Sequence, residues 1–203
     1  MKRLAATLVM GMLVALLVGT GVASAGSAGQ DTARGRVANA KMIRLVPQPD
    51  FCIPQPFPNP PLCFPQSPLQ VPTTAEADVD FNAKSSFNGT SPSGSARFTF
   101  RNEDPDQVFR GEVTCLNVQG NTATLSGPIT DARGGSTLTV DGQPSYEPRS
   151  FVITAVDNGK FSTQPDYIGY VLSPDLATDQ TCYTQSAPLN VVRDGEVVVQ
   201  DAL

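Results

Sequence analysis

The chain has 203 residues, with 14 basic and 19 acidic side chains, four cysteines, no histidine and no tryptophan. The absence of histidine excludes serine–histidine and cysteine–histidine catalytic pairs and histidine-ligated metal sites. An acidic chain lacks the cationic surface that phosphate backbones require, so we expect no nucleic acid partner.

The first 25 residues have the pattern of a cleavable signal peptide. Lys2 and Arg3 are followed by an uncharged, largely apolar run over residues 4–22. A small-residue cleavage site comes next, formed by Ala23 and Ala25 with Gly26 as the new N-terminus. The alternative is a retained membrane anchor, but glycines dilute the apolar run. We therefore expect a secreted protein without stable membrane insertion after cleavage, with 12 basic against 19 acidic side chains and a net charge of −7.

Two segments of low core-forming potential follow the signal. Residues 26–46 are small and polar, which predicts a flexible polar arm. Residues 47–74 form a Pro-rich strap, with ten prolines between positions 47 and 72, and this composition favours polyproline II over helix or interior strand.

The four cysteines of an exported chain predict two disulfides. Three pairings are formally possible. Cys52 and Cys63 lie close together in the strap, and Cys115 and Cys182 lie in expected strands, so we favour the pairings Cys52–Cys63 and Cys115–Cys182.

A disulfide between Cys52 and Cys63 requires the strap to double back, because a straight polyproline run would hold the two thiols roughly 34 Å apart. The turn is expected around Phe57. One interpretation is an exposed rigid loop that presents Phe57 to a partner. The interpretation we favour is a clipped strap that packs Phe51, Phe57, Leu62 and Phe64 against the domain.

From residue 75 to 203 the pattern changes to short alternating runs, which predicts one all-β domain, an antiparallel barrel or sandwich of about eight to ten strands. The expected strands are those around Val79 and Phe81, and then 96–101, 108–118, 122–129, 137–140, 151–156, 167–172 and 181–184. Asp194-Gly195 between two β-branched runs predicts a terminal hairpin over 191–199. Gly120-Asn121 and Asn158-Gly159 predict two further turns.

The stretch from Phe109 to Ala123 has the form F-x-G-x-V-x-C-L-x-V-x-G-N-x-A. It resembles a group of uncharacterised secreted actinobacterial proteins, with which residues 156–159, Asp166 and the segment 194–199 also agree. The resemblance spans roughly residues 78–203. It implies a single antiparallel, barrel-like β-domain and no established activity.

No pattern assigns a catalytic residue, a cofactor site or a metal ligand. Asp157, Asn158 and Asp166 offer oxygens that could hold calcium, although an Asx-type turn explains them better. Carboxylate-pair hydrolysis is the acid–base class that the missing histidines leave open, but no spacing singles out a pair among the glutamates Glu76, Glu103, Glu112, Glu147 and Glu196.

We expect a secreted, non-enzymatic β-domain that acts as an extracellular binding or cell-envelope-associated module, with an extracellular protein or a small ligand as partner. The first alternative is a small-ligand-binding or isomerase- or cyclase-like barrel with an open interior in which a tyrosine polarises the ligand. The second alternative is a protease inhibitor that uses the Cys52–Cys63 loop.

Overall fold

The structure is a computed structural model that describes residues 29–46, 49–56, 60–64, 66, 69–86, 89–101, 105–141, 145–177, 181–184, 187 and 189–202. The predicted signal peptide and its cleavage residues, together with Phe57, lie outside these ranges. In the described part of the chain, no helix has the length and apolar character needed to cross a membrane.

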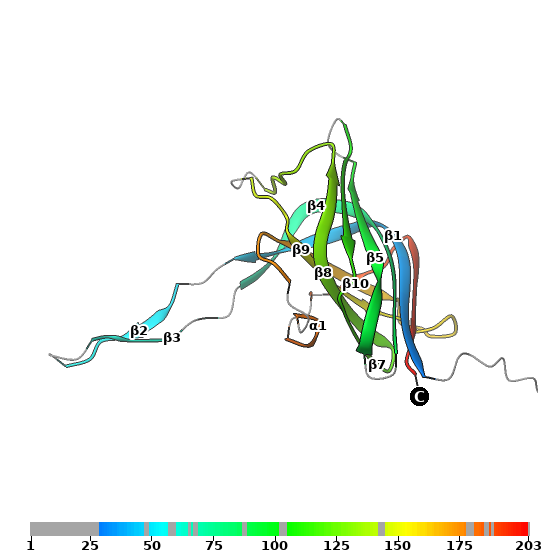
Figure 1. The fold of residues 1–203 in the computed structure, drawn as a ribbon, viewed down its shortest axis with the longest axis horizontal. Coiled ribbons are helices and arrows are strands. Elements are labelled where there is room, and N and C mark those ends of the chain that lie inside the picture. Colours follow the sequence, from blue (N-terminus) through cyan, green and yellow to red (C-terminus); the bar gives the residue numbers. More distant parts are fainter. Residues whose placement is uncertain are drawn as a thin grey trace, which may run out of the picture.

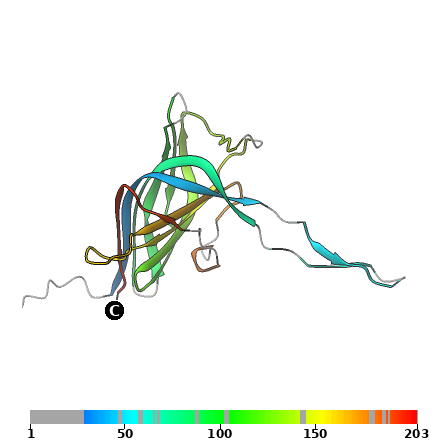
Figure 2. The same ribbon diagram turned by 180° about the vertical axis from the view of Figure 1, so that it is seen from behind.

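The fold is nearly all β, and it is a barrel (Figures 1 and 2). In chain order the elements are β1 (Gln30–Val46), β2 (Phe51–Ile53), β3 (Leu62–Phe64), β4 (Leu69–Ser86), β5 (Thr90–Phe100), β6 (Gln107–Glu112), β7 (Cys115–Gln119), β8 (Thr122–Arg133), β9 (Ser150–Val156), β10 (Tyr167–Ser173), α1 (Thr181–Thr184), β11 (Asn190–Val191) and β12 (Gly195–Gln200).

Seven strands close the barrel in the order β1, β4, β5, β6, β8, β9 and β10. Each of these strands is antiparallel to the next one in this order. Closure comes from a parallel pairing of β1 with β10, where Met42 lies opposite Tyr170. The remaining strands of this sheet extend the wall: β7 pairs with β8, β11 with β10, and β12 with β1.

Side chains fill the barrel interior. Inward positions alternate along each strand, and one cluster of buried apolar residues runs through all seven strands. Phe98 lies at its centre, with ring centroids 5.6 Å from Phe151 and 5.3 Å from Tyr170. A filled interior argues against the open-barrel alternative stated above.

The prediction of a flexible arm over 26–46 is wrong for residues 30–46, which form β1. The inward positions of this strand include Ala33 and Gly35, which carry little hydrophobic signal. Gly35 is required there because a Cβ would lie 2.5 Å from the ring of Phe81. The expected start of the β-domain at residue 75 also shifts, since β4 begins at Leu69 opposite Val46.

Four strand predictions between residues 108 and 199 are corrected. Residues 191–199 are not a hairpin: β11 pairs with β10, whereas β12 pairs with β1. Residues 137–140 contribute only a bridge from Leu138 to Tyr146, and residues 181–184 form α1. The expected strand 108–118 is two strands, β6 and β7, separated by Val113 and Thr114.

The turn at Gly120-Asn121 is confirmed. Gln119 pairs with Thr122, and Gly120 has a φ of 60°, as the first central residue of a type II′ turn requires.

Candidate functional site: the clipped β2–β3 hairpin

The expected fold-back of the Pro-rich strap is present as a two-stranded ribbon. Cys52 lies opposite Cys63, the two form a disulfide, and their Cα atoms are 4.0 Å apart. We call residues 49–56 and 60–64 the β2–β3 hairpin. It continues the ribbon of β1 and β4 and projects away from the barrel (Figures 1 and 2).

The two faces of the β2–β3 hairpin differ in chemistry. Phe51 lies opposite Phe64, and Ile53 lies opposite Leu62. Successive side chains of a strand point to opposite faces, so these four apolar side chains share one face and the disulfide lies on the other.

The apolar face is open to solvent. The exposed fractions are 55% for Phe51, 42% for Ile53, 50% for Leu62 and 45% for Phe64. The expectation that the strap packs these residues against the domain is therefore wrong for the three of its residues that are described. The reason is that the β1–β4 ribbon carries the hairpin outward before the chain turns back.

The β2–β3 hairpin has almost no charge. Between positions 47 and 72 the single ionisable residue is Asp50. Prolines flank both short strands, and they limit pairing of the ribbon edges with other strands because proline lacks a backbone donor. The exposed feature is therefore the apolar face and not the strand edge.

The second disulfide is part of the barrel. Cys115 of β7 and Cys182 of α1 are 2% and 3% exposed, and their Cα atoms are 5.8 Å apart. Both predicted pairings are confirmed. Disulfides such as these form and persist in oxidising compartments.

A separate cleft of about 570 Å³ is lined by residues 37–41 of β1 and by Tyr167 and Ile168 of β10, next to the position where these two strands pair. Its wall includes Lys41 and Glu76, which lie opposite each other, and the apolar side chains of Ile168 and Leu189. Asn190 also lies in this wall, and its buried Nδ2 has no hydrogen-bond partner in the part of the chain that the structure describes.

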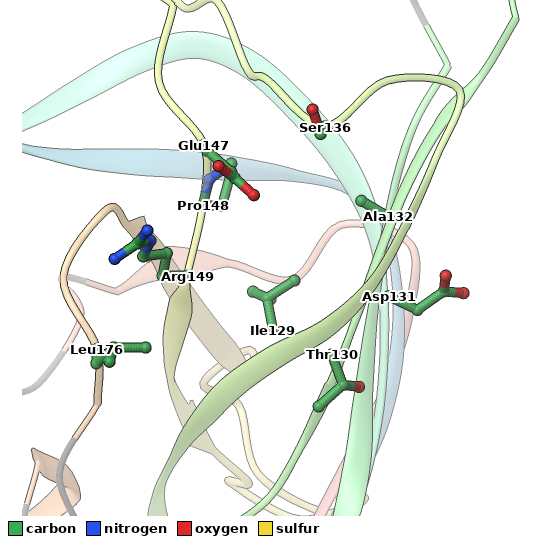
Figure 3. A pocket seen from close by; sticks show the side chains of 9 residues that line it. All are labelled: Ile129, Thr130, Asp131, Ala132, Ser136, Glu147, Pro148, Arg149 and Leu176. Atoms are coloured by element: carbon green, nitrogen blue, oxygen red, sulfur yellow. The ribbon is translucent and has the colours of Figure 1, made fainter.

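A smaller pocket of about 220 Å³ lies between β8 and the segment that leads into β9 (Figure 3). It contains two carboxylates, but Asp131 points away from Glu147 (Figure 3). The arrangement does not form the facing pair that glycoside hydrolysis uses.

Two tyrosines of the barrel, Tyr170 and Tyr146, bond to backbone carbonyl groups. The hydroxyl of Tyr170 donates to the carbonyl oxygen of Ala40 at 3.3 Å, and that of Tyr146 donates to the carbonyl of Leu172 at 3.1 Å. Burial raises the pKa of Tyr170 well above its ordinary value of 10.0, and the charges of Tyr146 and Glu76 raise it further. A phenol held neutral and bonded to backbone is not a general base.

The candidate calcium ligands already accept hydrogen bonds: the side-chain oxygen of Asn158 accepts from Nδ2 of Asn121 at 3.1 Å, and the two carboxylates accept from backbone nitrogens. Asp157 accepts from the amide nitrogens of Gly159 at 2.7 Å and Val199 at 3.1 Å, and Asp166 accepts from that of Asn158 at 2.9 Å. These bonds describe an Asx-type turn that also holds β12. Among the described residues, no group of three acidic or cysteine side chains could hold a metal ion.

The sequence alone drew attention to Phe51, Leu62 and Phe64, but it did not lead to the prediction that they share one face of the hairpin. The signal was present, because apolar residues flank each cysteine at i−1 and i+1, and a cross-strand disulfide fixes the register. Comparison with known proteins adds no identity: no family model, no curated protein and no solved structure matches this chain.

Proposed function

We propose that the protein is a secreted, non-enzymatic binding module whose β2–β3 hairpin inserts Phe51 and Phe64 into an apolar pocket of an extracellular protein. The observation that carries the proposal is the four-residue apolar face, held open to solvent on a disulfide-clipped ribbon. Isolated exposed apolar residues are common on proteins, whereas contiguous ones mark interaction sites.

Rigidity supports a role in binding. A ribbon clipped at Cys52 and Cys63 loses less conformational entropy on association than a free loop would. Phe51 and Phe64 lie directly opposite each other, so together they offer an aromatic anchor of the kind that dominates binding energy in protein interfaces.

Charge favours a protein over a lipid surface as the partner. Surface-bound membrane segments combine apolar residues with lysine or arginine. No basic residue lies between Arg44 and Lys84, and the mature chain is acidic.

The test compares three versions of the mature protein, immobilised and exposed to native culture medium: wild type, the double variant Phe51→Ser/Phe64→Ser, and Phe161→Ser. Phe161 is fully exposed on the β9–β10 loop, so its replacement removes a similar apolar side chain far from the hairpin. We expect a retained protein that is lost from the double variant and kept by Phe161→Ser. Equal urea midpoints for all three proteins establish that folding is unaffected.

Two results would contradict the proposal. One is a bound protein that the double variant retains as well as wild type. The other is hairpin-dependent flotation with uncharged phosphatidylcholine vesicles, which would identify a lipid surface as the partner.

A second candidate function is small-ligand binding in the cleft between β1 and β10. The Nδ2 of Asn190 supports it, because this buried donor has no acceptor among the described residues, such a donor is costly, and a ligand carbonyl would satisfy it. Native mass spectrometry of the secreted protein tests this candidate. An adduct present in wild type and lost in Asn190→Leu is expected, and an unliganded wild-type mass would count against it.

A further inference from the structure

A transverse row of charged residues crosses the outer wall of the barrel. Strand register places its members opposite one another, one per strand, from β12 through β1, β4, β5 and β6 to β8: Glu196, Arg36, Asp80, Arg97, Arg110 and Asp131. The signs alternate along the row except at one step, where Arg97 lies opposite Arg110.

This like-charge pair is unfavourable in the unliganded protein. Directly opposite residues have Cβ atoms about 5 Å apart, and like charges at that spacing destabilise a sheet. The neighbouring carboxylates do not remove the effect. Asp80 binds Arg36 at 3.4 Å, and Asp131 is closer to Arg133, at 3.1 Å, than to Arg110, at 3.9 Å. Arg97 has no ion-pair partner among the described residues.

The two arginines border a shallow trough of about 450 Å³ on the outer face. Its other polar lining residues are Asn82 and Ser95, which lie opposite each other in the next row, and Asp80 at the rim. Asn82 and Ser95 are short and exposed, so they leave space beside the two long guanidinium side chains.

We propose that Arg97 and Arg110 form an oxyanion-binding site for a phosphate ester or carboxylate carried by a hydroxyl-bearing molecule. Two guanidinium groups supply forked donors that match oxyanion geometry. The side chains of Asn82 and Ser95 provide neutral donors and acceptors for hydroxyl groups beside the anion. This site is separate from the β2–β3 hairpin, and it goes beyond the function proposed above.

The anion relieves the repulsion that the fold otherwise retains. Asp80 limits the affinity, because its carboxylate repels an anion at the rim, and Arg36 neutralises it only in part. The expected binding is therefore weak and sensitive to salt, since the site is open to solvent.

The test is a titration of amide chemical shifts in the folded mature protein with inorganic phosphate, glucuronate and glucose, at constant ionic strength set with sodium chloride. We expect saturable shifts at Ser95, Arg97 and Arg110 with an oxyanion and none with glucose. Tighter binding of phosphate would identify a phosphate ester as the natural group, and tighter binding of glucuronate would identify a sugar carboxylate.

Single-residue variants distinguish anion binding at Arg97 and Arg110 from a general attraction of anions to positive charge on this face. Arg97→Gln and Arg110→Gln should each weaken binding by about fivefold or more, because each removes a charge-assisted fork. The matched control is Lys84→Gln, which removes one positive charge from the same outer face of β4 and should change binding by less than about twofold. Equal weakening in the control, or shifts no larger than those with sodium chloride alone, would overturn the proposal.

Discussion

The two disulfides should contribute very differently to the stability of the barrel, although both close loops in the same chain. On the chain-entropy relation, a ring closed over a sequence separation of 11 stabilises by about 3 kcal/mol, and one over 67 by about 4 kcal/mol. The relation assumes that the native state holds the two cysteines in place without the bond.

That assumption holds for Cys115 and Cys182, which are buried between β7 and α1. It fails for Cys52 and Cys63, because, within the ranges that the structure describes, β2 and β3 pair with no other strand than each other. When this bond is removed, the β2–β3 hairpin gains freedom in the native state as well as in the unfolded state, so the two entropy gains largely cancel.

We expect Cys52→Ser/Cys63→Ser to lower the free energy of unfolding of the barrel by less than about 0.5 kcal/mol. Cys115→Ala/Cys182→Ala should lower it by about 4 kcal/mol, with a further cost for the lost buried sulfur atoms. In a chain of this size the second loss corresponds to a fall in Tm of about 8 to 16 °C.

The assay is urea unfolding of the oxidised mature protein followed by far-ultraviolet circular dichroism, because the chain has no tryptophan. Double variants avoid unpaired thiols. A loss of more than about 2 kcal/mol in the Cys52/Cys63 variant would refute the reasoning, because it would mean that the β2–β3 hairpin is coupled to the barrel.

Three further predictions concern single residues of the barrel. Because the pKa of Tyr170 is raised in the folded state, its ionisation should not affect the free energy of unfolding below pH 10. Above pH 10 that free energy should fall by about 1.4 kcal/mol per pH unit until the folded-state pKa is passed. Tyr170→Phe should remove this part of the pH dependence, as measured by urea unfolding at a series of pH values. Gly127→Ala should lower the free energy of unfolding by about 3 kcal/mol or more, because the new Cβ would overlap the carbonyl oxygen of Glu112. An unchanged Tm in thermal unfolding would contradict this close approach of the two backbones. Asp31→Asn should cost about 3 kcal/mol in urea unfolding, since the buried carboxylate accepts three hydrogen bonds that tie β1 to β4 and the C-terminal residues; a loss below about 1 kcal/mol would mean the amide replaces it.

The sequence predicts those strands whose inward positions carry large side chains. Phe98 in β5 alternates with Arg97 and Thr99, whereas Phe151 in β9 begins a short, almost continuous apolar run, and both patterns lie within observed strands. The same alternation exists in β1, but with alanine and glycine inward. Only the ring of Phe81, which is distant in sequence, explains why Gly35 must be small.

The terminal hairpin prediction failed because strand pairing is a competition between partners. Asp194-Gly195 has the composition of a two-residue turn, yet β12 pairs instead with the open edge of β1, where the backbone nitrogen of Ala38 donates to the carbonyl oxygen of Asp194 at 3.0 Å. Turn composition describes only local energy, whereas the free edge of β1 belongs to the assembled barrel.

In the candidate sites, too, some features follow from the local sequence pattern and others depend on the assembled barrel. The common face of Phe51 and Phe64 can be derived from the disulfide and the period of a strand, but the outward direction of the hairpin depends on where β1 and β4 leave the barrel. The opposition of Arg97 to Arg110 depends on register across β5 and β6, which the sequence does not contain.

The hairpin and the arginine pair impose costs that the barrel does not need for folding. The core is complete without Phe51 and Phe64, which remain exposed, and charge alternation along the row would be complete if position 97 carried a neutral residue. The two proposed binding roles would account for both features, because a partner would cover the apolar face and an anion would neutralise the guanidinium groups. Since the two features share no residue, loss of protein capture in Phe51→Ser/Phe64→Ser with unchanged phosphate binding, and the reverse in Arg97→Gln, would establish two independent sites.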